Sequence, residues 1–278
     1  MNEQALAQKR LWSGAAAAWR RWHDQQAAMS RLVTEAIVAE ARLGPGMRVL
    51  DLAGGTGEPS LTAAAAVGAG GHVAVTDISP QMIDAARHFA SRNGRANMSF
   101  HEVNIEAIPF ADASFDRVTC RFGIMFVPDT LRGLSEVRRV LGDGGRAAFA
   151  VWSSPARNPF IGDVNSVLAR HGRLQPPPPD APGLFRFAEP GSLSARLLDA
   201  GFRNVAERIE TVPWHFPGSL NDYFDFLLSG TPMGSAINAT DEPLRHEIID
   251  EVRAAVGRRV DGAVIRYEAE VIVASGER

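Results

Sequence analysis

The segment VLDLAGGTGEPS, residues 49–60, decides the fold class because it joins an apolar strand to a glycine-rich turn. Pro59 closes the turn and can occupy the first position of a helix. A strand, a glycine turn and a helix in this order are typical of the first βα unit of a parallel α/β sheet, which binds ligands at the helix N-terminus. Glycine lets the backbone approach a ligand closely and adopt positive φ. The segment therefore predicts a ligand-binding turn.

The spacing within the turn narrows the choice of ligand. A nucleoside triphosphate loop has the pattern GxxxxGK[ST], and no lysine follows Gly57. A dinucleotide turn has the pattern GxGxxG, whereas this chain has Ala53 before Gly54 and Gly55 and a different final spacing. Asp51 would repel a pyrophosphate but would suit a ligand with a free ammonium group. A ligand of another kind is therefore favoured.

The segments that follow the turn alternate between helical and strand patterns. Such alternation predicts a parallel α/β sheet with right-handed crossovers. Upstream, residues 4–42 predict two helices, which the GPG sequence at 44–46 ends. Within the core, we expect helices over 59–68, 80–94 and 129–145, and strands over 47–53, 72–79, 98–105, 115–126 and 146–153.

The second half of the chain is less regular. It predicts a helix over 189–202, strands over 204–216 and 263–275, and helices over 219–258 around a loop at Pro232 and Gly234. The proline-rich stretch 174–185 predicts an extended loop. We therefore expect an N-terminal helical segment (1–44), a ligand-binding core (45–153) and a C-terminal half (154–278) that completes the sheet, with lid insertions near 155–190 and 217–258.

Composition excludes several other classes of protein. The chain has 278 residues, a net charge of −3 and a single cysteine, Cys120, so neither a disulfide framework nor a cysteine-rich zinc site is expected. The histidines have no metal-ligand spacing, and we expect no metal. The negative charge disfavours nucleic acid as a partner. No apolar run is long enough for a membrane span, and the polar start predicts a cytoplasmic protein. Composition leaves the oligomeric state open between monomer and homodimer.

Two polar residues at the ends of later strands would complete a binding site. Asp77 ends a strand and follows Gly57 by about 20 residues, the spacing of an acid that accepts hydrogen bonds from ribose hydroxyls. Its alternative role is to cap the helix that begins near Pro80. Asn104 could bind an adenine edge, with Ile105 packed on the ring, or could be a turn residue.

Five segments then occur in order with suitable gaps: VLDLAGGTG, VAVTDISPQMIDAAR, NIEAIPFADASFD, CRFGIMFVPD and LSEVRRVLGDGG. Together they resemble the motifs of class I S-adenosylmethionine-dependent methyltransferases of the methyltransferase type 11 domain. The closest resemblance is to the ubiquinone/menaquinone C-methyltransferases, and it covers residues 47–153. The resemblance implies a Rossmann-like, doubly wound seven-stranded sheet, mostly parallel with one antiparallel strand from the late pair.

The resemblance also implies S-adenosylmethionine as cofactor and a role for each matching residue. Its methionine part would lie against the turn, with Asp51 near the ammonium group and Arg121 near the same end. Asp77 would bind both ribose hydroxyls. The residues implied are Asp51, Ala53, Gly54, Gly55, Thr56, Gly57, Asp77, Ile78, Met82, Asn104, Ile105 and Arg121; of these, Ile78 and Met82 would flank the adenosine, and Asn104 and Ile105 would bind the adenine. Ala53 and Asn104 depart from the commonest pattern, and binding is expected to survive both changes.

The methyl acceptor is expected to meet the second half of the chain. The stretch VPWHFPGSLNDYFDF, residues 212–226, mixes aromatic and polar residues, and His215 is the candidate general base. The alternative is that these are ordinary core and loop residues. Trp12, Trp19 and Trp22 fall near one helical face, which could cover the cofactor, pack on the core or do both.

The predicted function is therefore a methyltransferase that acts on a small aromatic or apolar metabolite or natural product. O- or C-methylation would proceed by in-line transfer that depends mainly on positioning. Two alternatives are a non-catalytic S-adenosylmethionine-binding protein with an assembly or regulatory role, and a nicotinamide-dependent oxidoreductase.

Overall fold

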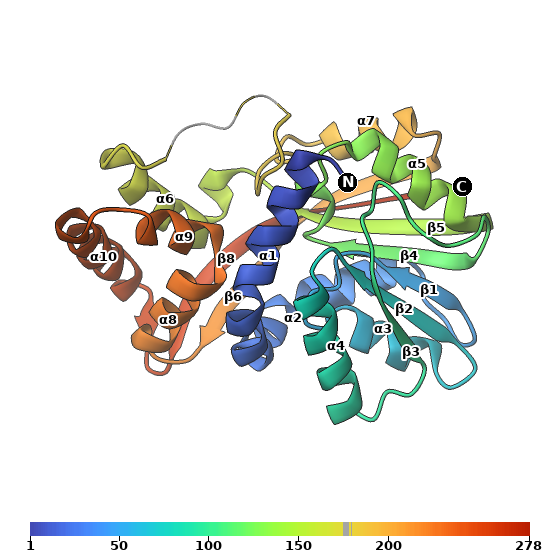
Figure 1. Cartoon of the computed structure of the whole chain (residues 1–278), viewed down its shortest axis with the longest axis horizontal. Helices are drawn as coiled ribbons and strands as arrows, with labels where there is room; N and C mark the ends of the chain where they lie inside the picture. Colours follow the sequence, from blue (N-terminus) through green and yellow to red (C-terminus); the bar gives the residue numbers. More distant parts are fainter. Residues whose placement is uncertain (175–177, 179) are drawn as a thin grey trace.

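The fold is an α/β sheet flanked by helices (Figure 1), seen in a computed structural model that describes residues 1–174, 178 and 180–278. The strands lie in the order β3-β2-β1-β4-β5-β8-β6, and a two-residue strand, β7, pairs with β8 as an eighth. β1 to β5 run parallel, whereas β8 is antiparallel to both β5 and β6. The predicted Rossmann-like sheet with one antiparallel strand is therefore confirmed. The strands are β1 (Arg48–Asp51), β2 (His72–Asp77), β3 (Met98–Glu102), β4 (Phe115–Arg121), β5 (Leu141–Trp152), β6 (Arg203–Pro217), β7 (Val260–Asp261) and β8 (Val264–Glu277).

The core helices follow their strands closely. α3 (Ser60–Val67) begins just after Pro59, and α4 (Pro80–Arg92) has Pro80 at its first position with the Ser79 side chain as its cap. β1 and β2 are buried along nearly their whole length, as expected of parallel strands covered on both faces. The carboxyl ends of these strands are therefore the places where a ligand can reach the sheet.

The N-terminal segment forms two helices, as predicted, and lies against the rest of the molecule. α1 (Glu3–Arg21) and α2 (His23–Glu40) meet at Trp22, whose backbone leaves the helical region. α2 packs on β4, β5, β6 and β8, while α1 contacts α4 on one side and α8 on the other. Figure 1 shows α1 crossing between the sheet and the C-terminal helices. This helix is thus placed to cover the strand ends.

The C-terminal half adds four helices near the far ends of β6 and β8. They are α6 (Pro159–Arg170), α8 (Leu220–Gly230), α9 (Pro232–Asn238) and α10 (Glu242–Gly257); α7 (Ser192–Asp199) precedes β6. The predicted loop at Pro232 and Gly234 is wrong, because both residues lie in α9. Thr231 caps this helix by accepting a hydrogen bond from the Gly234 N–H at 3.0 Å. Part of the predicted 174–185 loop lies at 175–177 and 179, outside the described residues.

Two predicted boundaries are wrong in a way that shapes the site. The expected 129–145 helix, α5 (Thr130–Val140), ends earlier and β5 starts at Leu141, where Gly142, Gly144 and Gly145 do not favour a helix. The expected 115–126 strand ends at Arg121 because Phe122 adopts φ 59° and turns the chain into a short 3-10 helix, η1 (Ile124–Phe126). This turn brings residues 121–123 to the end of the sheet.

Candidate active site

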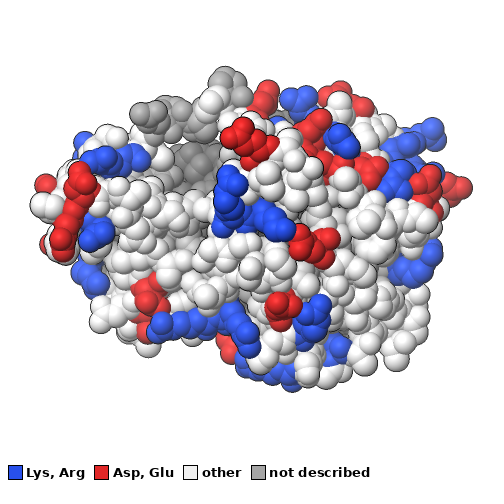
Figure 2. Space-filling view, in the orientation of Figure 1, with Lys and Arg blue, Asp and Glu red and all other residues white. Residues whose placement is uncertain are grey.

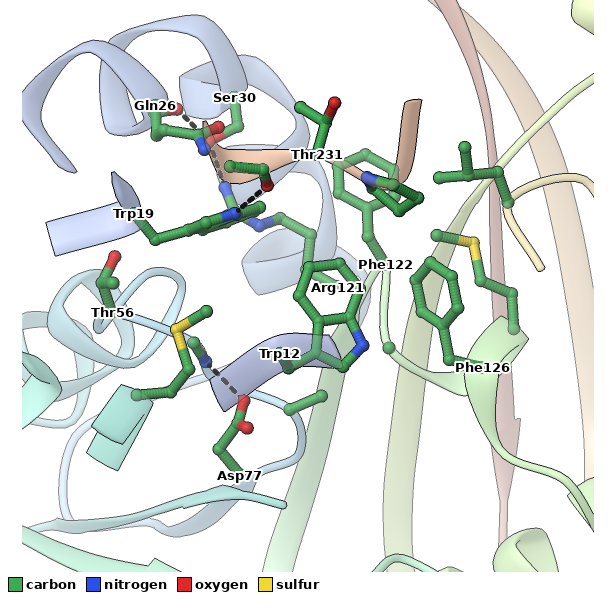
Figure 3. A pocket seen from close by; sticks show the side chains of 18 of the residues that line it. Trp12, Trp19, Gln26, Ser30, Thr56, Asp77, Arg121, Phe122, Phe126 and Thr231 are labelled. Carbon is green, nitrogen blue, oxygen red and sulfur yellow. Dashed lines mark hydrogen bonds between the residues drawn. The ribbon is translucent and has the colours of Figure 1, made fainter. Parts of the chain in front are cut away.

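One cavity lies at the carboxyl ends of β1, β2 and β4. Residues from the N-terminal helical segment, the ligand-binding core and the C-terminal half all line it. Its volume of about 220 Å³ is many times the roughly 10–15 Å³ that one water molecule needs. Figure 3 shows Asp77, Thr56 and Arg121 around the same space as Trp12, Trp19 and Phe122. The cavity therefore has room for an organic ligand between polar strand ends and aromatic rings.

The glycine turn forms part of the wall. Ala53, Gly54, Gly55 and Thr56 line the cavity, whereas Gly57 is not among the described lining residues. Ala53 and Gly55 both have positive φ, 52° and 53°. A Cβ atom on Gly54 would lie 3.0 Å from both Asp51 Oδ2 and Val75 Cγ1. The turn is therefore closely packed against Asp51 and Val75 on the side away from the cavity, and its backbone forms part of the cavity surface.

Asp51, which was predicted to lie beside a ligand ammonium, is not among the described residues that line the cavity. Its side chain is fully buried beneath the turn. Thr119 Oγ1 donates a hydrogen bond to Asp51 Oδ1 at 2.6 Å, and Ser60 Oγ donates to Oδ2. Burial raises the pKa of Asp51 to about 6, although both hydrogen bonds oppose the rise. Glu58, a residue outside the predicted set, does line the cavity, and its carboxylate accepts hydrogen bonds from the N–H and Oγ1 of Thr62.

Asp77 lines the cavity where the ribose of a nucleoside would be expected. Its Oδ2 accepts a hydrogen bond from the Gly55 N–H at 3.1 Å, and its Oδ1 accepts from the Ser79 N–H at 2.9 Å. Burial raises the pKa of Asp77 to about 6. The helix cap itself is the Ser79 side chain, so the cap alternative for Asp77 is not what the structure shows. The carboxylate ties the glycine turn to the start of α4.

The other residues predicted for the nucleoside also line this side of the cavity. They are Ile78, Met82, Asn104 and Ile105. Asn104 Oδ1 accepts a hydrogen bond from the Glu106 N–H at 3.1 Å, and its Nδ2 donates to Glu106 Oε2 at 3.2 Å. Asn104 therefore shapes a turn as well as facing the cavity, so its two predicted roles are compatible.

Arg121 supplies the positive charge of the cavity wall. Its guanidinium donates to Thr34 Oγ1 at 2.8 Å, to the Glu58 carbonyl at 3.0 Å and to Ser30 Oγ. Among the residues that the structure describes, no carboxylate lies within ion-pair distance of it. Burial lowers the pKa of Arg121. A half-buried cation without a carboxylate partner among the described residues favours an anionic group on the ligand.

The N-terminal helices contribute polar residues to the cavity wall that no sequence motif predicted. His23 is buried, stacks on Phe89 with ring centroids 3.5 Å apart, and its Nδ1 lies 3.0 Å from Thr56 Oγ1. Burial lowers the pKa of His23 to about 4, so the imidazole is neutral at pH 7. His23 and Thr56 thus link α2 to the glycine turn, and both line the cavity.

The tryptophans of this segment divide between the two expected roles. Trp12 and Trp19 line the cavity, and Trp19 Nε1 donates to the Gly230 carbonyl at 2.7 Å, which ties α1 to α8. Trp22 instead lies at the break between α1 and α2, buried against Phe216.

The part of the cavity wall that comes from the strand ends is called the polar half. It comprises Ala53, Gly54, Gly55, Thr56, Glu58, Asp77, Ile78, Asn104 and Arg121.

The opposite part of the wall is made of rings, and we call it the aromatic half. Trp152 stacks on Phe122 with centroids 3.9 Å apart, and Trp214 stands at 89° to Trp152 at 5.0 Å. Phe160 stacks on Trp214 at 5.3 Å. The aromatic half comprises Phe122, Phe126, Trp152, Phe160, Trp214, Tyr223 and Phe226. Its rings come from the end of β4, η1, β5, α6, β6 and α8.

His215 does not lie in the cavity, so the prediction of a general base at this position is not supported. It lies on β6 between Trp214 and Phe216, which are both buried. Successive side chains of a strand point to opposite faces of the sheet. Because Trp214 lines the cavity, His215 points away from it, and it pairs in register with Arg266 of β8.

On the face of the molecule shown in Figure 2, charged side chains of one sign are not gathered into a single patch. Figure 2 shows acidic and basic side chains interspersed over the face it presents. One cluster, His171, Glu247 and Glu251, brings three possible metal-ligand atoms within 4.8 Å of one another. Glu251 is already paired with Arg170 and His171, and none of the three residues lines the cavity. Among the described residues, no helix is long and apolar enough to cross a membrane.

The sheet order and the polar strand ends define the class I methyltransferase fold with a nucleoside-type binding site. The model of the ubiE/COQ5 methyltransferase family matches residues 25–164. The chain is 42% identical over 195 residues to the ubiquinone/menaquinone biosynthesis C-methyltransferase UbiE of Brucella anthropi, covering 66% of this chain and 74% of that one. The chain therefore belongs to the ubiE/COQ5 methyltransferase family, which goes against the nicotinamide alternative.

Other comparisons show how much of the chain resembles known proteins. The UbiE of Stenotrophomonas maltophilia K279a is 40% identical over 142 residues, so the match spans 49% of this chain and only 56% of that relative. The YcgJ protein of Bacillus subtilis has a TM-score of 0.57 at 20% identity and covers 88% of this chain and 97% of its own, which shows the fold. The part matched by the family model, residues 25–164, contains the polar half and four of the seven residues of the aromatic half, whereas Trp214, Tyr223 and Phe226 lie beyond it.

The cavity wall fits S-adenosylmethionine, the cofactor of this class. A Cβ atom on Gly55 would meet no atom within 4 Å, Asp77 can accept hydrogen bonds from hydroxyls, and Arg121 lacks a carboxylate partner among the described residues. Gln8 Oε1 and Gln26 Nε2, on two residues of the wall, are buried with no hydrogen-bond partner in the described part of the chain. Such orphaned polar atoms are costly unless a ligand satisfies them.

Proposed function

We propose that this protein transfers the methyl group of S-adenosylmethionine to a small aromatic or apolar molecule, at carbon or oxygen. The observation that supports it best is the continuity of one cavity, whose polar half suits the cofactor and whose aromatic half suits such an acceptor. Clefts lined by rings with a few placed polar groups are typical of small-molecule sites. We propose a cytoplasmic location as well.

Within the polar half we propose one role for each of three side chains. Asp77 accepts hydrogen bonds from the ribose hydroxyls, and Arg121 donates to the methionine carboxylate. Glu58, in place of Asp51, supplies the negative charge beside the ammonium group, because Glu58 is a lining residue while the Asp51 side chain lies beneath the turn. Asp51 then acts indirectly by supporting Gly54.

The chain's contribution to the reaction is mainly position and exclusion of water. When bound, the cofactor supplies a methyl group on a sulfonium, already activated for in-line transfer. The titratable residues among the described lining are His23, Glu58, Asp77, Arg121 and Tyr223. Four of them belong to the cofactor side, and burial raises the pKa of Tyr223 well above its usual range, so it is no base at pH 7. The rings would therefore hold an acceptor that is already nucleophilic.

Binding of the reaction product tests the cofactor site. Calorimetry with S-adenosylhomocysteine should give one site per chain, and absence of binding at millimolar concentration would refute the proposal. Transfer of labelled methyl from S-adenosylmethionine to members of a panel of phenols and other apolar aromatic compounds tests the reaction. Binding without transfer to any acceptor would instead favour the non-catalytic alternative.

A further inference from the structure

Phe122 stands where the polar and aromatic halves of the cavity meet. It directly follows Arg121, whose guanidinium carbon lies 6.0 Å from the Phe122 ring centroid. On the other side its ring stacks on Trp152 and lies edge to face with Trp214 at 6.2 Å. Figure 3 shows Phe122 and Arg121 bordering the same space. A group bound beside Phe122 would therefore be close to both cofactor and acceptor.

The backbone at Phe122 is strained. Its φ of 59° lies in the left-handed region, which a bulky residue rarely adopts and which glycine would adopt without penalty. The Phe122 N–H donates to the Ala150 carbonyl at 2.8 Å, which fixes this conformation. A strained residue held by its surroundings in a ligand cavity is a reason to look for a function of its side chain.

The packing behind this residue explains how its position is kept. A Cβ atom at Gly123 would lie 2.4 Å from the Ala53 Cβ and 2.9 Å from Cys120 Sγ, so there is no space for the chain to shift there. Ala53, in the glycine turn, also has positive φ. The turn after β4 is thus pressed against the turn after β1. The Phe122 ring therefore has a defined position relative to the cofactor turn.

One face of the Phe122 ring is covered and the ring is only half-buried. Trp152 covers this face at an interplanar angle of 11°. The remaining ring surface is part of the cavity wall. Aromatic rings prefer offset or edge contacts with other rings, so this surface would accept a flat partner better than a puckered one. In the aromatic half as the structure describes it, no side chain is charged, so the part of this wall away from Arg121 favours an uncharged partner.

We propose that Phe122 determines the specificity of the acceptor site by holding a planar, uncharged ring against its free surface beside the methyl donor. The inference rests on the proposed function and adds that planarity of the acceptor is selected at this one side chain. The strained backbone and the Trp152 stack keep the ring in place, so the acceptor is aligned without a hydrogen bond from Phe122.

The test compares two probes of similar size, planar 2-naphthol and puckered decahydro-2-naphthol. Their affinities are measured by calorimetry for the full chain saturated with S-adenosylhomocysteine. Wild type should prefer 2-naphthol. Phe122→Leu should weaken 2-naphthol binding by about two- to twelvefold, the range for one aromatic contact, and leave decahydro-2-naphthol binding unchanged. Phe122→Tyr should retain the preference.

Two further variants serve as controls. Phe122→Gly removes the ring but suits the φ of 59°, so it should fold and behave like Phe122→Leu. Phe110→Leu removes a ring that packs on His101 and Phe115 outside the cavity and should change neither affinity. Affinity for S-adenosylhomocysteine should stay within about twofold in every variant, since that is the scale of a weak indirect effect.

Several outcomes would overturn the inference. Equal weakening of both probes by Phe122→Leu would mean that the ring only fills space. Loss of the planar preference in Phe122→Tyr, or binding of S-adenosylhomocysteine but not of 2-naphthol by wild type, would also contradict it. If wild type fails to bind S-adenosylhomocysteine, the proposed function itself fails, which distinguishes the two failures.

Discussion

The polar and aromatic halves of the cavity are built in different ways. The polar half comes from the carboxyl ends of β1, β2, β3 and β4 and from the turns that follow them, and Gly54 and Gly55 contribute only backbone to it. The aromatic half is entirely side chains, and its rings come from segments as far apart as Phe122 and Phe226. A backbone turn needs glycine at set positions, whereas a wall of rings can be assembled in many ways. The first half therefore leaves a short motif in the sequence, and the second does not.

The largest expected effect on the polar half alone comes from Asp77→Ala. The variant removes the carboxylate proposed for both ribose hydroxyls and the acceptor of the Gly55 N–H. Hydrogen bonds to a charged group contribute about 1.5–3 kcal/mol each, so affinity for S-adenosylhomocysteine should fall roughly 100-fold or more by calorimetry. Asp84→Ala, at an exposed site on α4, is the matched control and should bind as wild type. Unchanged affinity in Asp77→Ala would refute the ribose assignment.

Gly123→Ala should affect both halves, because Gly123 lies between the turns that carry them. The new methyl group would meet Ala53 Cβ at 2.4 Å, and such overpacking costs about 1–3 kcal/mol. We expect a lower thermal midpoint and weaker binding of both S-adenosylhomocysteine and 2-naphthol. Adding Ala53→Gly removes the closer clash and should restore part of the loss. A Gly123→Ala protein with wild-type stability would show that the two turns are not pressed together.

Much of the fold could be predicted because its signals are local. Pro59, Pro80 and the glycines near 54–57 mark where helices and the first turn begin, and the structure places them there. The end of the strand at Arg121 was missed, since nothing in the residue type of Phe122 favours positive φ. That conformation is imposed by tertiary contacts with Ala150 and Trp152, which are distant in sequence.

The site was predictable to the extent that it is backbone and strand ends. Asp77 and Arg121 end their strands, Asn104 follows one, and all three line the cavity. Asp51 also ends its strand, but its carboxylate accepts hydrogen bonds from Thr119 and Ser60 beneath the turn. His23 and Gln26 reach the cavity only because α2 packs across the sheet. No pattern in their own segment carries that information.

The pH dependence of cofactor affinity should be smaller than the effect of deleting Asp77. The pKa of Asp77 is about 6, and the ionised form is the better acceptor for hydroxyl groups. Affinity for S-adenosylhomocysteine should therefore be full above about pH 7 and fall roughly tenfold by about pH 5, as the carboxyl becomes protonated. Asp77→Asn should bind weakly with a flat profile over this range. An equally steep profile in Asp77→Asn would assign the titration to another group.

The smallest expected effect is that of His215→Ala, which tests which face of β6 points into the cavity. His215 and Trp214 are neighbours in sequence, but only Trp214 lines the cavity, because alternate strand residues face opposite sides. Methyl transfer in His215→Ala should remain within about twofold of wild type, since no contact with the acceptor is lost. Trp214→Phe, on the cavity face, is the comparison variant, and it should weaken 2-naphthol binding more than His215→Ala does. If His215→Ala greatly lowers the rate of methyl transfer while affinity for S-adenosylhomocysteine stays intact, this segment of β6 must change so that His215 faces the cavity when the acceptor binds. His215 would then again be a candidate base.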